Sequence, residues 1–594
     1  MNHDEPHQGT HKSYSACGIR GQVNDLAASI NSPSTSANTN SCEFHEPIGY
    51  IDPLRLDTMG GGIERQDRQH RSRLIHLFAS SRIPIHVEKR LLMSHLLIVI
   101  LSICTFCIQL KSNATETIIR PNIVFILIDD LRHDTFGHAG HPFIQTPYID
   151  QLARGGLRFT NAFVTTSLCS PSRATFLTGK YMHNHKVVDN SSLMDKQEQT
   201  FPQRLQQADY RTAFIGKWHM GGSSDAARPG FDHWVSFRGQ GTYQPTGQFL
   251  NIDGSKVART KYMTDELTDH ATQWLSKQTP EQPFMLYLSH KGVHGLYDPA
   301  PRHRDQYKNS SYSRPATMDN TPENNAGKPM WVQDQRNSWH GVEFPYHGRA
   351  KQSIEEMYRH YCEMILSIDD SVGRLLETLE AKGMSKQTLV IFTSDGGHLW
   401  GEHGLIDKRC AYEESIRIPL LAYWPSKIEP KTRSEALVAN TDIAPTMLDL
   451  ANLDIPTSMN GKSIVPLLSD PNSPTWGRKS LLYEYYWEPA FPQTPTTFAL
   501  RDQHYKLIQY HGLWDTDELY DVSNDPSETT NLINAPDQTQ RVAAMRKELH
   551  RRLSQTSGLA IPLGIKRNHG SNLRNPHGST RAKFPKAIIR SSPH

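Results

Sequence analysis

Polar and charged side chains follow four short apolar runs of the sequence, each at the point where the run ends. In an open parallel sheet, ligands bind at the carboxyl ends of the strands, so these side chains are expected to share one edge. Taken singly, each group has an ordinary interpretation as a turn or a helix cap, but four of them in one chain favour a site. The groups are Asp129 and Asp130, Lys217 and His219, His290 with Lys291 and His294, and Asp395 with His398.

The chemistry of this set combines a cation site with an anion site. Three aspartates brought together repel one another unless a cation lies among them, and oxygen ligands favour Ca²⁺ or Mg²⁺. The lysines and histidines then require an anion of their own. A metal beside basic side chains is the arrangement that binds an anionic ester oxygen, from either a sulfate or a phosphate.

A cysteine, Cys169, precedes Ser-Pro at the predicted start of a helix. Ser170 and Pro171 suit a first helical turn, and the amides and dipole of a helix start favour negative charge at residue 169. The alternative is a buried structural thiol, which is the usual fate of a free cysteine. The seven cysteines are scattered and odd in number, which argues against a disulfide framework.

The elements that must position these residues alternate along the chain from about residue 121. The short apolar runs are typical of buried parallel strands, and helical patterns such as that of residues 357–383 lie between them. We therefore predict an α/β fold with a large mixed, mostly parallel sheet sandwiched by helices, plus a smaller C-terminal α+β subdomain with a short antiparallel sheet. Residues 298–349 are predicted to form a long loop that shapes a binding site.

The two ends of the chain differ from this pattern. Residues 1–90 lack hydrophobic periodicity and are predicted to be a disordered extension, unless translation starts later, and residues 564–594 a basic disordered tail. Lys89 and Arg90 precede an apolar stretch, so residues 91–115 are predicted to be a signal peptide or a signal anchor. We expect an exported protein, periplasmic or extracellular, that contacts the membrane only if the apolar segment stays uncleaved.

Around Cys169 the sequence resembles the sulfatase family, because it matches the C-x-P-S-R signature and the LTGK that follows. The resemblance continues in NIVFILIDDLRHDTFG, GKWHMG and TSDGGHLWGEHGLIDKR, and it extends over about residues 118–535. It implies an alkaline-phosphatase-like fold. Because the alternation of strands and helices loosens after about residue 471, we predict a sulfatase catalytic domain at residues 116–470 and a C-terminal subdomain at residues 471–563.

The resemblance also implies a mechanism. In this family a formylglycine-generating enzyme oxidises the cysteine to formylglycine, whose hydrate attacks sulfur with one hydroxyl and expels sulfate with the other. Asp129, Asp130, Asp395 and residue 169 would ligate a metal, Ca²⁺ or alternatively Mg²⁺. The remaining implied roles are that Arg173 holds the nucleophile, Lys217 and Lys408 bind sulfate oxygens, His219 assists the hydroxyl chemistry, and His294 protonates the leaving alcohol.

One position departs from the family pattern. Many members have Asn or His directly after the last metal aspartate, where this sequence has Gly396. A glycine side chain cannot ligate, so either His398 or a water is expected to complete the shell. His183 and His185 lie close to the nucleophile helix in the sequence and are predicted either to line the substrate pocket or to sit on its rim.

The expected substrate is a sulfated sugar or glycan, since the motifs look most like those of N-acetylglucosamine-6-sulfatases and mucin-desulfating enzymes. Two alternatives stay open: a formylglycine-dependent phosphonate or phosphate ester hydrolase, and a non-catalytic protein that binds sulfated glycans. The expected partners are the sulfated carbohydrate and the formylglycine-generating enzyme. A net charge of +3 does not indicate nucleic-acid binding.

Overall fold

The computed structural model describes residues 120–561 apart from 222–223, 344–351, 489–490 and 513–514, together with Met93 and residues 96–101. The chain divides into two units, Met1–Lys111 and Ser112–His594, and the fold below belongs to the second. The predicted N-terminal extension, the basic tail and most of the predicted signal segment lie outside the described residues. Within the described residues, no helix is both long enough and apolar enough to cross a membrane.

A ten-stranded sheet forms the centre of the second unit. Its middle strands, β9, β1, β8, β4 and β5, run parallel, whereas β12 runs antiparallel to both of its neighbours and β6 and β7 add an antiparallel edge. This confirms the predicted mixed, mostly parallel sheet. In order across the sheet, the strands are β13 (Thr432–Ser434), β2 (Leu157–Phe159), β12 (Leu420–Tyr423), β9 (Thr388–Ser394), β1 (Asn122–Ile128), β8 (Phe284–Ser289), β4 (Arg211–Gly216), β5 (His233–Ser236), β6 (Phe249–Ile252) and β7 (Ser255–Ala258).

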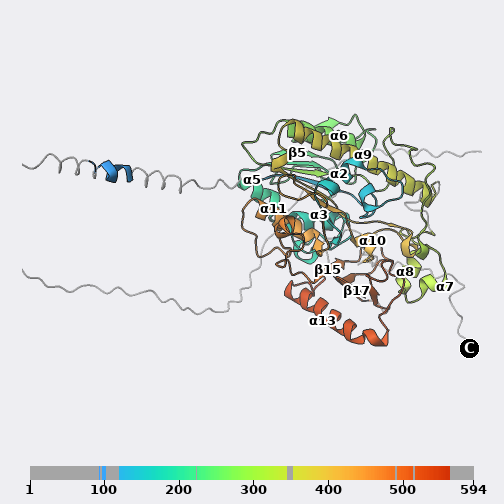
Figure 1. Cartoon of the computed structure of the whole chain (residues 1–594). Coiled ribbons are helices and arrows are strands. Elements are labelled where there is room, and N and C mark those ends of the chain that lie inside the picture. The colour runs from blue at the N-terminus through green and yellow to red at the C-terminus, as the bar shows by residue number, and fades with distance from the viewer. Residues whose placement is uncertain are drawn as a thin grey trace, which may run out of the picture. The chain divides into compact units, whose positions relative to one another are not determined.

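Helices cover both faces of this sheet, which explains why its strands are apolar throughout. In β1, Ile123 and Phe125 belong to one hydrophobic core while Val124 and Ile126 belong to the other, because successive side chains point to opposite faces. Figure 1 shows the two helical layers. One face carries α3 (Cys169–Thr178), α5 (Phe201–Gln207) and α11 (Ile443–Leu450), and the other carries α2 (Pro147–Gly155), α6 (Met263–Ser276) and α9 (Ile354–Ala381).

The segments between strands agree with the sequence expectations in one case and differ in another. The helical pattern of residues 357–383 forms α9, which starts where Ser353 accepts a hydrogen bond from the amide of Glu356 and ends before Gly383, whose φ is +66°. The predicted loop at residues 298–349 instead contains short helices. Each starts beside a proline, as a first helical turn permits: Ala316–Met318, α7 (Pro322–Asn325) and α8 (Met330–Gln335).

A second, four-stranded antiparallel sheet follows and confirms the predicted C-terminal sheet. Alternate side chains of its first strand, such as Leu481 and Tyr483, join the core beneath the main sheet, while Leu482 packs with Leu549 of the last helix. The sheet therefore lies between the main core and that helix (Figure 1). Its elements are β15 (Ser480–Tyr485), β16 (Thr497–Asp502), β17 (Tyr505–Tyr510), β18 (Glu518–Asp521) and α13 (Thr539–Gln555).

Candidate active site

Cys169 is the first residue of α3, and the sequence before it explains its position. Leu168 is extended, with φ −155° and ψ 132°, and the helix starts abruptly at Cys169 with Ser170 and Pro171 in its first turn. The amide of Ser170 donates to Oδ1 of Asn190 at 3.0 Å. Every residue of α3 is buried, yet Cys169 lines a cavity of ≈ 1100 Å³. The thiol therefore lies at the base of an open pocket.

Three aspartates meet beside this thiol because their strands are neighbours. Asp129 and Asp130 follow β1, Asp395 follows β9, and Ile128 of β1 is in register with Ser394 of β9. Asp130 has φ +63°, which bends the chain so that its amide donates to Oδ1 of Asp395 at 3.2 Å. All three are buried, and one carboxylate oxygen from each lies within 4.8 Å of the others.

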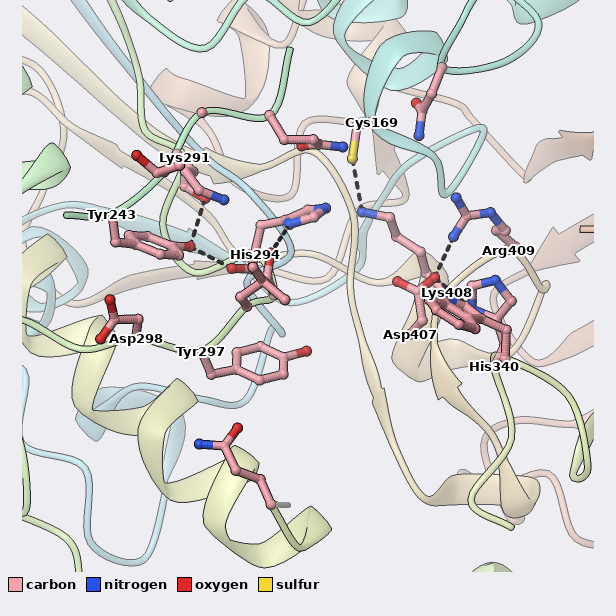
Figure 2. Close-up of a pocket in the computed structure, with 18 of the residues that line it drawn as sticks. Cys169, Tyr243, Lys291, His294, Tyr297, Asp298, His340, Asp407, Lys408 and Arg409 are labelled. Atoms are coloured by element: carbon pink, nitrogen blue, oxygen red, sulfur yellow. Dashed lines mark hydrogen bonds and ion pairs between the residues drawn. The ribbon is translucent and has the colours of Figure 1, made fainter. Parts of the chain in front are cut away.

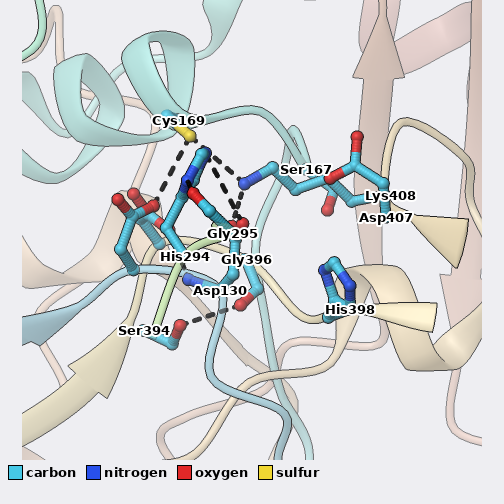
Figure 3. Close-up of polar contacts among 12 residues, drawn as sticks. Asp130, Ser167, Cys169, His294, Gly295, Ser394, Gly396, His398, Asp407 and Lys408 are labelled. Atoms are coloured by element: carbon cyan, nitrogen blue, oxygen red, sulfur yellow. Dashed lines mark hydrogen bonds and ion pairs between the residues drawn. The ribbon is translucent and has the colours of Figure 1, made fainter. Parts of the chain in front are cut away.

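A basic side chain pairs with each aspartate. Nζ of Lys217 contacts Asp129 and Nζ of Lys408 contacts Asp130, while Nη2 of Arg173 lies 2.6 Å from Oδ2 of Asp395. Two of these pairs also contact the thiol. Nζ of Lys408 donates to Sγ of Cys169 at 3.2 Å, and that Sγ donates to Oδ1 of Asp129 at 3.5 Å. Figure 3 shows Cys169 and Lys408 pointing at each other.

The electrostatics of the cluster follow from this crowding. Burial would raise the pKa of Asp129, but Lys217 and the neighbouring cations outweigh burial and hold it well below its usual value. Burial and the charge of Asp129 raise the pKa of Asp395 to about 7. Burial also lowers the pKa of Lys408 to about 7. The carboxylates repel one another despite their basic partners, as expected of a site built for a divalent cation.

The residues therefore fit a hard cation such as Ca²⁺ or Mg²⁺, since they present buried oxygen ligands from three aspartates. At Gly396, where many family members have Asn or His, there is little space for a side chain. A Cβ there would lie 3.3 Å from Oγ of Ser167 and 3.6 Å from Cδ of Lys408. His398 stands nearby, and one of its ring nitrogens lies within 4.8 Å of carboxylate oxygens of Asp130 and Asp407. Its Nε2 shares a hydrogen bond of 3.0 Å with the hydroxyl of Tyr297.

The two histidines given chemical roles also lie at this edge. His219 follows β4 in a left-handed conformation, with φ +60°, and its Nδ1 lies 3.2 Å from Oγ of Ser170. Nε2 of His294 lies 4.0 Å from Oδ2 of Asp130, and its Nδ1 donates to the carbonyl of Gly295. Burial lowers the pKa of both, to about 3 for His294. All nine residues predicted for the site are thus brought together.

His183 and His185 do neither of the things predicted for them. Both lie on α4 (Met182–His185), but Nδ1 of His183 pairs with Oε2 of Glu484 in β15 at 2.7 Å, and Nε2 of His185 lies 3.1 Å from Oγ1 of Thr175. Neither lines the cavity that contains Cys169. His183 instead ties α4 to the C-terminal sheet, a contact that its distance from Glu484 in the sequence concealed.

Sequence reasoning identified Lys291 and the segment 298–349, but it missed most of the other individual residues of the pocket wall. Figure 2 shows Asp407, Arg409 and His340 on one side of Cys169, and Tyr243 and Lys291 on the other. The hairpin of β10 (Leu399–Trp400) and β11 (Ile406–Asp407) presents Asp407, Lys408 and Arg409 in succession, and Nδ1 of His340 lies 2.9 Å from Oδ2 of Asp407. The consecutive residues Asp407, Lys408 and Arg409 could have indicated this wall, but only Lys408 was predicted to belong to the site.

Comparison with known proteins agrees with this geometry. The family model described as sulfatase matches residues 121–453, and the model described as N-sulphoglucosamine sulphohydrolase, C-terminal, matches residues 401–556. An N-acetylglucosamine-6-O-sulfatase of Bacteroides thetaiotaomicron is 33% identical over 493 residues, covering 74% of this chain and 86% of that protein. The human N-acetylglucosamine-6-sulfatase is 29% identical, covering 70% and 82%.

A solved structure also resembles this chain over most of its length. It is that of a protein in complex with its substrate D-glucosamine-2-N,6-O-disulfate, with a TM-score of 0.69 and 30% sequence identity. The match covers 75% of this chain and 99% of that one. The likeness therefore includes the C-terminal sheet as well as the main sheet.

Proposed function

This chain belongs to the sulfatase family, and on that premise we propose that it hydrolyses the 6-sulfate ester of a glucosamine-type sugar. The observation that carries the proposal is the position of Cys169, between the ammonium of Lys408 and the carboxylate of Asp129, at the base of a cavity large enough for a sugar. The relatives that act on N-acetylglucosamine 6-sulfate support this choice of substrate.

The groups around Cys169 account for binding of the sulfate ester. Asp129, Asp130 and Asp395 would hold Ca²⁺ or Mg²⁺, which when bound withdraws charge from a sulfate oxygen and lowers the pKa of a hydroxyl on residue 169. Lys217 and Lys408 present their ammonium groups to the remaining sulfate oxygens. Because both lysines are buried, their attraction for an anion is stronger than it would be in water.

The proposal includes maturation of Cys169 by a formylglycine-generating enzyme, which supplies a hydrated aldehyde with one hydroxyl to attack sulfur and another to expel sulfate. Arg173 orients residue 169 from the next turn of α3, where it is fixed by the carbonyl of Lys217 at 2.7 Å and by Oγ of Ser289 at 2.6 Å. His219 contacts the helix start through Ser170, from where it would accept and return a hydroxyl proton. His294 lines the pocket, where its ring would face the leaving alcohol.

The wall formed by Asp407, Arg409 and His340 supports a sugar substrate. Arg409 pairs with Asp407 and donates from Nε to Oε1 of Glu488 at 3.1 Å, so the carboxylate and the guanidinium are held rigidly beside Lys408. A fixed pair of acceptor and donor suits the vicinal hydroxyls of a pyranose. We propose that this wall binds ring hydroxyls while Lys408 contacts the sulfate.

The test uses protein produced together with a formylglycine-generating enzyme and loaded with Ca²⁺. Peptide mass spectrometry should find an aldehyde at residue 169, and the protein should release sulfate from N-acetylglucosamine 6-sulfate. Aryl sulfate and aryl phosphate, compared at equal concentration, separate a sulfatase from a phosphonate or phosphate ester hydrolase. Cys169→Ala is the control that should bind substrate without turnover. Matured, metal-loaded protein that releases no sulfate from any sulfated sugar would contradict the proposal.

Export is also proposed, on the basis of the two basic residues and the apolar stretch that precede the catalytic unit. Cell fractionation followed by N-terminal sequencing checks this. A periplasmic or secreted protein that begins near residue 115 indicates a cleaved signal peptide, whereas a full-length protein in the membrane fraction indicates an anchor. Recovery of uncleaved protein in the cytoplasm would contradict export.

A further inference from the structure

Lys291 is a buried cation in the active-site pocket to which the sulfatase mechanism gives no role. It follows β8, is 3% exposed, and lines the same cavity as Cys169 and His294. Its ammonium lies 4.3 Å from the centre of the Tyr243 ring, a cation–π contact that also brings it to the pocket wall. A side chain of this kind, left without an anion, is costly to bury.

The carboxylates nearest to this wall are already paired with other groups. Asp129 pairs with Lys217, and Asp298, which also lines the cavity, pairs with Nη2 of Arg304 and accepts from Nε2 of Gln244 at 3.1 Å. Within the described part of the chain, no carboxylate forms an ion pair with Lys291. Burial, together with the charge of Lys217, lowers the pKa of Lys291 to about 7, as expected of an ammonium that lacks a counter-ion.

Lys291 is also separate from the groups that surround the reacting atom. Lys408 donates directly to Sγ of Cys169, and Lys217 contacts Asp129, which itself contacts that sulfur. Of the described residues, none links the ammonium of Lys291 to Cys169 or to the three aspartates by a hydrogen bond or an ion pair. In Figure 2, Lys291 and Tyr243 lie on the side of Cys169 opposite to Lys408 and Arg409.

We propose that Lys291, with Tyr243 beneath it, is a second anion-binding position that recognises a charged substituent of the substrate other than the sulfate ester being cleaved. The proposal rests on the sulfatase function proposed above and defines its substrate class as sugars with two anionic groups. Either an N-sulfate on the same ring or the carboxylate of an adjoining uronic acid would supply the second anion. The binding experiment compares sugars that carry one or the other.

The first measurement is of binding, with Cys169→Ala protein so that no turnover interferes. Calorimetry compares glucosamine 6-sulfate that carries an N-acetyl group, the same sugar with an N-sulfate, and the N-acetyl sugar linked to a uronic acid. One of the two doubly anionic ligands should bind about 10- to 100-fold more tightly than the singly sulfated sugar. In Cys169→Ala/Lys291→Met protein this preference should fall to within about threefold.

The second measurement is the ratio of kcat/KM on the preferred doubly anionic substrate to kcat/KM on the singly sulfated one. Lys291→Met should reduce this ratio about 10- to 100-fold. Lys261→Met is the matched control, because Lys261 is exposed and pairs with Asp269 outside this cavity, and it should leave the ratio as it is. Equal losses on both substrates would place Lys291 on the scissile sulfate and overturn the proposal, as would an unchanged ratio.

These outcomes separate the proposal from the function on which it rests. If matured wild-type protein releases sulfate from neither substrate, the proposed function fails, and the binding preference of Cys169→Ala protein still decides whether a second anion is recognised. If Lys291→Met protein does not fold, as judged by its thermal unfolding, the same preference measured in Cys169→Ala protein decides the question. Equal affinity for singly and doubly anionic sugars overturns the proposal in either case.

Discussion

Two buried groups of charges lie in this molecule, one below the pocket and one beneath the C-terminal sheet, and each contains three carboxylates and three basic side chains. The metal-edge cluster consists of Asp129, Asp130, Arg173, Lys217, Asp395 and Lys408. The docking cluster consists of Lys328, Glu413, Arg501, Lys506, Glu518 and Glu528.

The docking cluster joins the C-terminal sheet to a short helix, α10 (Glu413–Ile416), and to the segments that contain Lys328 and Glu528. Nζ of Lys506, on β17, lies 2.7 Å from Oε1 of Glu528 and 3.1 Å from Oε1 of Glu413, which begins α10. The hydroxyl of Tyr412 donates to Oε2 of Glu518 on β18 at 2.8 Å. Each charge thus has a partner from a different element, which fixes the C-terminal sheet in place rather than preparing it for a ligand.

The pKa shifts of Lys506 and Lys408, the central lysines of the two clusters, distinguish a structural network from a binding site. Burial would lower the pKa of Lys506, but Glu528 and Glu413 outweigh burial and raise it. The pKa of Lys408 falls to about 7, because burial exceeds the attraction of Asp129 and Arg409 adds repulsion. Both clusters hold a carboxyl with a pKa of about 7, Asp395 and Glu528, so a shifted carboxyl pKa alone does not identify the site.

Lys408→Met tests the functional side of this contrast and has the largest expected effect. Removal of a buried cation that contacts Cys169 should lower kcat/KM for sulfate release about 10²- to 10³-fold, since a donor aimed at the sulfate is lost. Steady-state kinetics on metal-loaded, matured protein measure this. A loss below about threefold would show that Lys408 does not contact the sulfate.

Lys506→Met is the matched substitution in the docking cluster. It should lower the stability of the protein and leave its catalytic activity unchanged. It leaves the buried carboxylates of Glu413 and Glu528 without their shared cation, so the free energy of unfolding should fall by about 3–5 kcal/mol. Urea unfolding followed by circular dichroism measures the loss. The kcat/KM of the remaining folded protein should equal that of the wild type, and a selective loss of activity would remove the distinction between the clusters.

Removal of the metal ion should destabilise the metal-edge cluster and leave the docking cluster unaffected. Dialysis against EDTA should abolish sulfate release and reduce the free energy of unfolding, by about 2.7 kcal/mol relative to protein held at a hundredfold excess of Ca²⁺ over its Kd. Addition of Ca²⁺ should restore both. Lys506→Met protein should respond to Ca²⁺ by the same increment, because its defect lies elsewhere, and a response that is absent in both proteins would argue against the cation site.

His185 is a buried titratable group that forms no ion pair with any described residue, so its contribution to stability should depend on pH. Burial, with the charges of His183 and Lys180, lowers its pKa to about 3, so folded protein keeps it neutral while the unfolded chain protonates it below pH 6.5. Its contribution to stability is therefore present above pH 6.5 and declines as the pH falls toward 3, by about 2 kcal/mol at pH 5.

Urea unfolding of wild-type and His185→Gln protein at pH 7 and pH 5 checks this expectation. The loss between the two pH values should be about 2 kcal/mol smaller in the variant, since glutamine does not titrate. Other buried histidines, such as His290, titrate in both proteins and cancel in the difference. Equal losses would mean that His185 is protonated in the folded protein.

Gly396→Ala has the smallest expected effect. Its Cβ would lie 3.3 Å from Oγ of Ser167, so the side chain of Ser167, two residues before Cys169, must shift slightly, which should cost about 1 kcal/mol of stability and a few-fold in kcat/KM. Gly397→Ala is the contrasting neighbour, since a Cβ there would lie 2.0 Å from the carbonyl oxygen of Glu414 and should prevent folding. Thermal unfolding and kinetics of both variants test this, and a Gly396→Ala protein as damaged as Gly397→Ala would contradict it.

Much of the site could be predicted because the sequence carried local signals for it. Asp129 and Asp395 follow apolar runs that form adjacent parallel strands, so both were expected at one edge. Lys408 was found only through its register in a motif. Residues 298–349 were predicted to shape a binding site, and His340 in that segment lines the cavity, but no local signal singled out His340 itself. The contact of His183 was not predicted, because its partner Glu484 lies 301 residues away in the sequence.

The sequence alone determined which side chains reach the carboxyl edge of the sheet, because apolar runs of strand length end where parallel strands end. It also determined the chemistry at the start of α3, since Cys-Ser-Pro specifies both the thiol and the helical turn. Only the tertiary structure decided which buried lysines have counter-ions. Lys506 acquires two glutamates from distant elements and Lys291 none within the described residues, and that difference depends on packing between segments far apart in the chain.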